Sequence, residues 1–129
     1  MKKTKKYILQ RIMSYCQEIS NTVDKVSFDD FIKDDNFEKR NSCAFCLIQI
    51  GELSKTLNDD FKSKYSKVKW KDWVFIRNYI AHNYEEFSMD RVWRISRENI
   101  PKLLKYTQEI LSDINKLEKK AEQSRRLSR

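Results

Sequence analysis

Apolar positions recur at helical spacing along most of this chain. Near the N-terminus they predict a helix over residues 5–23, with one apolar face directed towards a core. Near the C-terminus a second stripe predicts a helix that begins close to Pro101 and runs to about residue 117. The two stripes consist of Ile8, Ile12, Tyr15, Ile19 and Val23, and of Leu103, Leu104, Ile110, Leu111, Ile114 and Leu117.

Two segments between these stripes are apolar around most of their circumference. Residues 37–57 and 70–83 are each long enough for a helix, and a helix that is apolar on most sides is normally packed on several sides. We therefore expect both to be central. The second segment is especially rich in large side chains, namely Trp70, Trp73, Val74, Phe75, Ile76, Tyr79, Ile80 and, just beyond it, Tyr84.

Polar residues mark where these helices begin and end. Ser27, with Asp30 three residues later, resembles a capping box and predicts a short helical turn. Asn58 and Ser88 are further predicted N-caps. Pro101 suits the first turn of a helix better than an interior, so we expect a break or kink near residues 98–99.

Composition agrees with a single helical domain. The 129 residues include one Gly and one Pro, which favours long helices and few turns. We predict an all-α, up-and-down bundle of four main helices with short additional helices, spanning residues 7–117. There is no membrane-length apolar run, and the N-terminal lysines precede no apolar secretory segment, so a cytoplasmic location is expected.

The net charge of +8 comes from the two ends of the chain. Residues 1–6 and the segment from Lys116 onward each contribute +4, while residues 7–115 carry equal numbers of basic and acidic side chains. We define residues 1–6 and 118–129 as basic tails. Such tails either add salt-sensitive attraction to nucleic acid or are merely solvated, frayed ends, and the sequence leaves both interpretations open.

The three cysteines are expected to be core residues. Cys43 and Cys46 have Cys-x-x-Cys spacing, but they lie in an apolar helical run. A structural zinc site needs about four ligands, and Cys16 and one histidine do not complete a convincing set. We therefore predict packing in a reducing compartment, with no metal and no cofactor.

Four polar side chains in or just after the second apolar segment are the candidate functional residues. Arg77 interrupts the apolar stripe, and burying a guanidinium is costly unless it is paired or meets an anion. Asn78 and His82 lie one helical turn apart on one face, whereas Arg77 is about 140° from His82. Arg77 and His82 can meet if the arginine reaches around the helix or if the helix ends near His82. The second case is plausible because Asn83 readily terminates a helix. Tyr84 would share a face with Arg77 if the helix continued.

These residues also resemble a known family. Arg77-x-x-x-x-His82-x-Tyr84, with a polar residue after the arginine, is similar to the signature of HEPN-superfamily ribonucleases, and the tyrosine points to the HepT-like toxins. The flanking segments are similar to that family in order and spacing over roughly residues 7–112. They are Ile50-Gly51-Glu52, Val68-Lys69-Trp70, Met89-Asp90-Arg91-Val92-Trp93 and Asn99-Ile100-Pro101.

The resemblance implies metal-independent RNA cleavage, in which a ribose 2′-hydroxyl attacks the adjacent phosphorus and leaves a 2′,3′-cyclic phosphate. His82 then acts as acid or base, Arg77 stabilises charge on the phosphoryl oxygens, and Asn78 holds the imidazole or a phosphate oxygen. Arg40, Glu52 and Asn83 are candidate supporting residues. Glu52 is the obvious partner for Arg77, whereas Arg40 is more readily explained as a partner of Asp35 or Glu38.

The resemblance also implies partners. One histidine cannot easily be both acid and base, and HEPN ribonucleases are dimers whose two motifs face one cleft, so a symmetric homodimer is expected. HepT-like toxins are encoded beside a minimal nucleotidyltransferase antitoxin that transfers AMP to the motif tyrosine, here Tyr84. The RNA substrate of the family is transfer RNA or messenger RNA.

Two alternatives stay open at this point. The chain is a ribonuclease toxin, or it is a non-catalytic helical subunit that docks a nucleotidyltransferase. An arginine locked onto an internal acid, with the imidazole away from any open groove, would favour the second. A nucleotide-binding sensor is weaker, because one glycine cannot build a Gly-rich phosphate loop.

Overall fold

The structure is a computed structural model that describes residues 4–83 and 88–128. These residues form helices and contain no strand, which confirms the all-α prediction with four long helices. In chain order the elements are α1 (Lys5–Asp24), α2 (Phe28–Phe31), the 3₁₀ turn η1 (Asp34–Asn36), α3 (Phe37–Lys55), α4 (Asp59–Lys64), α5 (Trp70–His82), α6 (Met89–Arg94), the π-helix η2 (Ile95–Asn99) and α7 (Ile100–Leu127).

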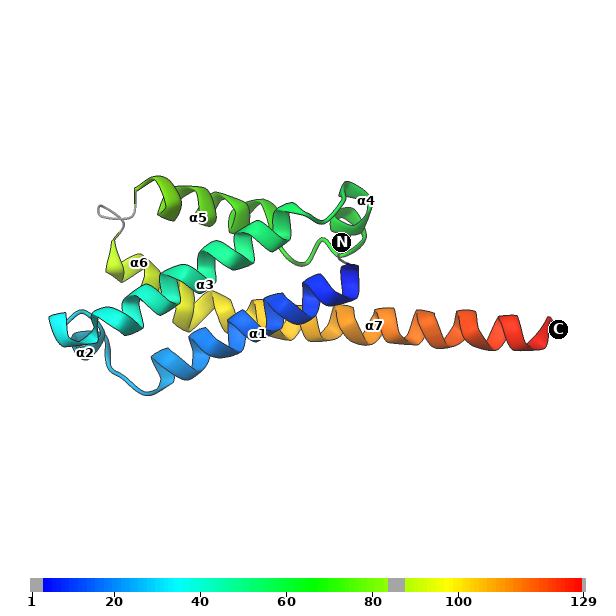
Figure 1. The fold of residues 1–129 in the computed structure, drawn as a ribbon, viewed down its shortest axis with the longest axis horizontal. Coiled ribbons are helices and arrows are strands. Elements are labelled where there is room, and N and C mark those ends of the chain that lie inside the picture. The colour runs from blue at the N-terminus through cyan, green and yellow to red at the C-terminus, as the bar shows by residue number, and fades with distance from the viewer. Residues whose placement is uncertain (1–3, 84–87, 129) are drawn as a thin grey trace.

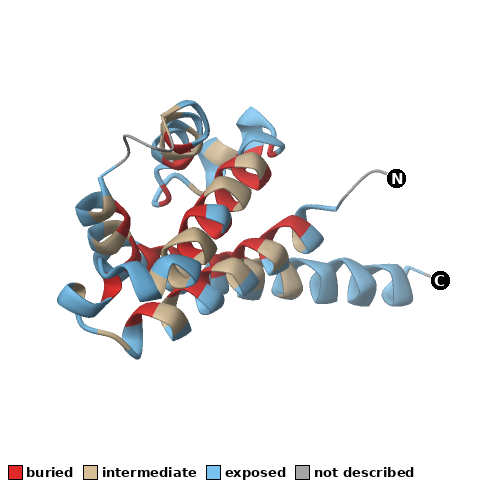
Figure 2. Cartoon of the chain, turned by 60° about the vertical axis from the view of Figure 1, so that its left-hand side comes forward, coloured by how far each residue is buried: buried red, intermediate tan, exposed pale blue. Residues whose placement is uncertain are grey.

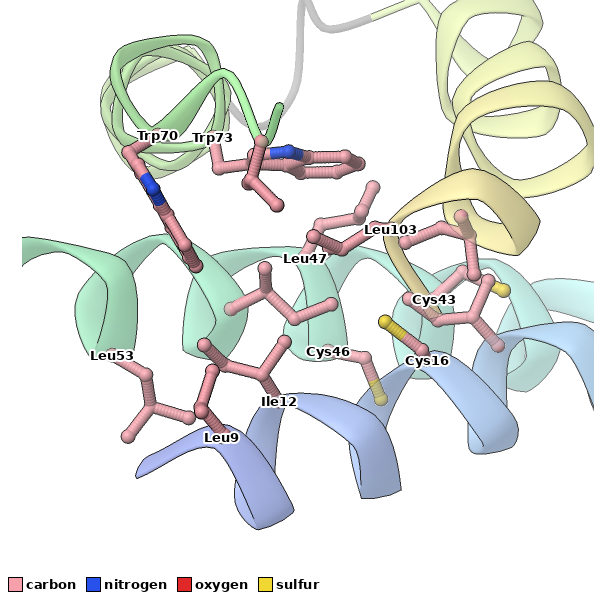
Figure 3. Close-up of a cluster of buried hydrophobic side chains, with 14 of the residues drawn as sticks. Leu9, Ile12, Cys16, Cys43, Cys46, Leu47, Leu53, Trp70, Trp73 and Leu103 are labelled. Carbon is pink, nitrogen blue, oxygen red and sulfur yellow. The ribbon is translucent and has the colours of Figure 1, made fainter. Parts of the chain in front are cut away.

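The third helix, α3, lies between α1 and α5, and α7 packs along α1 (Figure 1). The core forms where these helices meet. Figure 3 shows Trp70 and Trp73 reaching from α5 towards α3, opposite residues of α1 such as Leu9 and Ile12. Leu9, Ile12, Leu47 and several other aliphatic side chains have no exposed surface, so burial of the predicted stripes holds the bundle together.

Two of the three predicted N-caps are confirmed, because Ser27 accepts a hydrogen bond from the Asp30 N–H and Asn58 accepts one from the Phe61 N–H. The Thr4 hydroxyl, which was not predicted as a cap, accepts from the Tyr7 N–H at the start of α1. Ser88 occupies the N-cap position of α6, but its side chain makes no capping hydrogen bond.

The prediction that α5 is packed on several sides is wrong. Only Trp70, Trp73 and Ile80 are buried, all on the side that faces the bundle, while the Phe75 side chain on the outer side is 65% exposed. The outer face of α3 is also open, since Phe45 is 55% exposed. The apolar residues on these outer faces are therefore not covered by the described part of this chain.

The sequence predicts a break or kink near residues 98–99, and the structure has no break there but interrupts the regular α-helix with a π-helix. The chain passes through the π-helix η2, where the Ile100 N–H donates to the Ile95 carbonyl, and continues directly into α7. Pro101 has no N–H to donate and occupies the first turn of α7. A wider turn placed just before the proline accommodates it without ending the helix.

The last helix extends well past the bundle. Residues 116–128 are all exposed, although α7 is helical as far as Leu127 (Figures 1 and 2). The basic segment at this end is therefore a solvated helix in the structure. No helix in the described part of the chain is long and apolar enough to cross a membrane.

All three cysteines are buried and unpaired, which confirms their prediction as core residues (Figure 3). Burial raises the pKa of Cys16 and of Cys43 to about 12 and that of Cys46 to about 11. These thiols are therefore protonated at neutral pH and behave as small apolar side chains.

Candidate functional site

The site begins with a close crossing of α3 and α5. Gly51 is buried at this crossing, where a Cβ atom would overlap the Cβ of Arg77 and lie 2.7 Å from the Trp73 carbonyl oxygen. The absence of a side chain at Gly51 lets the two backbones approach. Arg77 therefore leaves α5 directly against α3.

Glu52 is the partner of Arg77, as predicted. The Arg77 Nε atom forms an ion pair with Glu52 Oε1, without the alignment of a hydrogen bond, and Arg77 Nη1 donates to Asn78 Oδ1 at 2.9 Å. The Arg77 side chain is 26% exposed and that of Glu52 is 43% exposed. The two paired atoms, Arg77 Nε and Glu52 Oε1, are buried, as expected for a buried guanidinium, while the rest of each side chain is partly exposed.

This arrangement leaves donors available. Within the described residues Nη2 of Arg77 has no partner, and the amide nitrogen of Asn78 is likewise unused, because only its oxygen accepts from the arginine. Both groups are N–H donors, which suit the oxygen atoms of a phosphodiester. The sequence did not predict that Asn78 would bind the arginine rather than the imidazole.

His82 is exposed and is the last residue of α5. The helix ends there because Asn83 turns back, its main-chain N–H and its side-chain amide both donating to the Tyr79 carbonyl at 2.9 and 3.2 Å. The predicted terminator is thus confirmed. Among the described residues, no hydrogen bond joins His82 to Arg77 or Asn78, and His82 does not line any of the four main hollows.

The other candidates fall in different places. Arg40 donates through Nη1 to the carbonyl oxygens of Phe31 and Lys33, so it closes the end of α2 and pairs with neither Asp35 nor Glu38. It does not contact Arg77. Tyr84 lies outside the described residues. Among the described residues, no group of three or more His, Cys, Asp or Glu side chains is arranged to hold a metal ion.

Comparison with known proteins identifies the family. A family model described as ribonuclease HepT-like matches residues 12–110. The chain belongs to the HepT-like ribonuclease family. This membership supports ribonuclease activity, with RNA as the substrate, and confirms the resemblance in the sequence.

Individual relatives agree with this assignment. A candidate RNase of Caldanaerobacter subterraneus is 33% identical to this chain over 84% of its length and 96% of the relative. A candidate RNase of Methanocaldococcus jannaschii is 31% identical over 88% of this chain and 92% of the relative. A candidate ribonuclease HepT of Thermococcus cleftensis is 27% identical over 80% of this chain and 92% of the relative. No solved structure matches the chain.

Proposed function

We propose that this protein is a metal-independent endoribonuclease, the toxin of a type VII-like toxin–antitoxin pair. The ribose 2′-hydroxyl oxygen attacks the adjacent phosphorus, and the bond from phosphorus to the 5′-oxygen breaks. The 2′-hydroxyl proton passes to a base, and an acid protonates the departing 5′-oxygen. The products are a 2′,3′-cyclic phosphate and a 5′-hydroxyl.

The observation that carries this proposal is the positioning of Arg77. Glu52 and Asn78 hold the partly exposed guanidinium, whose Nη2 has no partner among residues 4–83 and 88–128, and the tight crossing at Gly51 fixes the backbone from which it projects. A positioned cation with free N–H groups stabilises charge that builds on phosphoryl oxygens in the transition state. Arg77 takes this role, and the free amide of Asn78 binds a second oxygen or the imidazole.

His82 supplies the proton transfers, and the chain has one histidine. A base and an acid on opposite sides of the phosphorus therefore require His82 from two copies, which is the reason for proposing a symmetric homodimer. The exposed Phe75 side chain on the outer side of α5 supports a contact between copies. His82 lines none of the four main hollows among the described residues, which fits a cleft completed by a second copy.

Tyr84, two residues after His82, is the proposed site of AMP transfer by a minimal nucleotidyltransferase antitoxin. Each AMP adds a bulky base and a negatively charged phosphodiester close to the catalytic residues. This modification would block RNA and repel its backbone. The RNA substrate is transfer RNA or messenger RNA.

The second candidate is a non-catalytic helical subunit that docks a nucleotidyltransferase. The Arg77–Glu52 ion pair favours it, because a guanidinium paired with an acid needs no phosphate. This alternative predicts a stable complex with the nucleotidyltransferase, no RNA turnover, and normal growth when the chain is expressed alone.

The test is RNA cleavage by the purified, unmodified protein in EDTA, with the wild type compared with His82→Ala. We expect cleavage that leaves a 2′,3′-cyclic phosphate, and a loss of at least about 100-fold in the variant. Because His82 is exposed, the variant should unfold at the same temperature as the wild type. Activity that needs a divalent ion, or that survives the substitution, would refute the proposal.

A further inference from the structure

Three hollows follow one another along the side of the bundle formed by α4, the start of α5 and α7. The first lies between the start of α1, α4 and α7, and it shares Lys64 and Tyr65 with the second. The second shares Lys67 and Tyr106 with the third, which reaches Trp73 of α5. Neighbouring hollows share wall residues and therefore adjoin one another, and we call the row of three the lysine groove.

The groove has a local excess of lysines that the net charge of residues 7–115 does not reveal. Residues 62–71 contain five lysines and no acidic residue, although residues 7–115 are balanced as a whole. Six lysines and four carboxylates line the three hollows, and one of the carboxylates, Glu118, is paired with Lys6 at 3.3 Å. Among the described residues, Lys64, Lys67, Lys69 and Lys102 form no ion pair.

Aromatic rings alternate with these lysines. Tyr106 lines both the second and the third hollow and is partly exposed, and no hydrogen bond or ring contact holds it to another described residue. Tyr65 is oriented by its hydroxyl, which donates to Asp113. Lysines that follow a backbone, with aromatic faces between them, are the elements with which proteins bind single-stranded nucleic acid.

The groove also leads towards the proposed catalytic end of α5. Its last residues on that helix are Trp73 and Ile76, and Ile76 precedes His82 by a rise of about 9 Å. Tyr79 lies between Ile76 and His82 in α5, and the guanidinium of Arg91 is 5.8 Å from the centre of the Tyr79 ring. The positive side chains thus continue beyond the groove towards His82.

We propose that the lysine groove binds the single-stranded backbone of the RNA substrate several nucleotides from the cleaved bond. This inference rests on the proposed ribonuclease function and adds a binding site outside the Arg77–His82 motif. The lysines bind phosphates, and Tyr106 stacks on a base. Single strands are preferred over duplexes, because stacking on Tyr106 needs a base that is free of its neighbours.

The test measures binding of a fluorescent twelve-nucleotide single-stranded RNA, using full-length protein with His82→Ala so that the probe is not cut. We compare Lys67→Glu/Lys102→Glu in the groove with Lys25→Glu/Lys39→Glu, which changes the net charge by the same amount. Lys25 is the C-cap of α1 and Lys39 lies in the first turn of α3, and these helix ends lie far from α4 in Figure 1. Neither control lysine forms an ion pair with a described residue. Thermal unfolding checks that each variant folds.

We expect the groove variant to raise Kd at least about tenfold at 50 mM salt, and the control to raise it less than about threefold. Loss of two phosphate contacts should also lower the slope of log Kd against log salt by about 1.4 for a single strand. Tyr106→Leu should weaken binding about tenfold without changing that slope, because stacking releases no counterions. A duplex of the same sequence should bind less tightly than the single strand.

Equal losses in the groove and control variants would overturn the inference, because they would indicate attraction by net charge alone. Retained RNA binding with lost binding of a glutamate-rich peptide would overturn it in favour of a protein partner. Cleavage assays separate the two proposals. If the groove variant binds RNA normally and His82→Ala abolishes cleavage, RNA binding by the groove is refuted and the ribonuclease proposal is supported. If RNA binds through the groove but the wild-type protein never cuts it, the ribonuclease proposal is refuted and RNA binding by the groove is supported.

Discussion

Gly51 of α3 and Arg77 of α5 touch where the two helices cross. A methyl group at position 51 would overlap the Arg77 Cβ and approach the Trp73 carbonyl oxygen to 2.7 Å. One of these neighbours is backbone and cannot rotate away. The same crossing therefore sets the distance between two helices and the origin of the candidate catalytic arginine.

Gly51→Ala should destabilise the protein by about 1–2 kcal/mol, because overpacking costs about 1–3 kcal/mol and better helix propensity returns at most about 1. The melting temperature should fall by roughly 3–8 °C. Cleavage per folded molecule should also fall, since Arg77 is displaced. At an open helix position the substitution would raise stability, so a higher melting temperature would contradict the crossing as described.

Glu52→Gln removes the negative charge that holds Arg77 but keeps the shape of the side chain. The ion pair is partly exposed, so we expect a stability change below about 1 kcal/mol. We expect the single-turnover cleavage rate to fall about tenfold or more, because the guanidinium is no longer held in place. Glu38→Gln, on the same helix and in no ion pair with a described residue, is the control. Faster cleavage by Glu52→Gln would instead mean that the ion pair with Glu52 keeps the Arg77 guanidinium from binding the phosphate of the RNA.

Phe75→Glu should weaken the proposed homodimer. Phe75 is 65% exposed on the outer face of α5, so the change costs little in a lone chain but buries a charge if that face is an interface. We expect the dimer dissociation constant to rise at least tenfold by sedimentation equilibrium, with cleavage lost at low protein concentration. Phe37→Glu is the matched control, since Phe37 is 57% exposed at the start of α3. Equal behaviour of the two variants would exclude this face of α5 as the interface.

The cysteines predict a loss of stability at alkaline pH. The native pKa values of Cys16 and Cys43 are raised to about 12 and that of Cys46 to about 11, whereas unfolded thiols titrate near 9. Above pH 9 the unfolded chain loses these protons first, so folding weakens by about 1.4 kcal/mol per thiol and pH unit. Below pH 9 this contribution is fully present. Urea unfolding at pH 7, 9 and 10 measures the slope.

The control for this prediction is Cys16→Ala/Cys46→Ala, which should be less stable at pH 7 but lose less stability between pH 9 and 10. A native thiol assay at pH 8 should find all three cysteines slow to react until denaturant is added. Fast labelling of the native protein would show that these thiols are not enclosed.

The helices were readily predicted because each long stripe of apolar residues has a single favourable arrangement in a bundle. The pairing of Glu52 with Arg77 and the close approach at Gly51 could also be anticipated, since an unpaired cation or a needless glycine would be costly there. Periodicity could not show how many sides of α5 are covered. Phe75 looks the same in sequence whether a neighbouring helix or another chain covers it.

Two further features depend on how distant segments meet. The π-helix before Pro101 stands where the sequence predicts a break or kink, and the chain stays helical through it. The lysine groove brings Lys102 beside Lys67, which are far apart in the chain, and a charge sum over the whole domain cannot reveal it. Whether His82 reaches a phosphate stays a prediction, as does the role of Tyr84.

The projecting end of α7 affects which methods can determine the oligomeric state of this protein. Its 28 residues form a rod about 42 Å long, and roughly the last third of that rod stands clear of the bundle. A molecule with such an arm experiences more friction than a sphere of the same mass, so it elutes early from a sizing column even as one chain. Stoichiometry must therefore come from light scattering or equilibrium centrifugation, which report mass rather than shape.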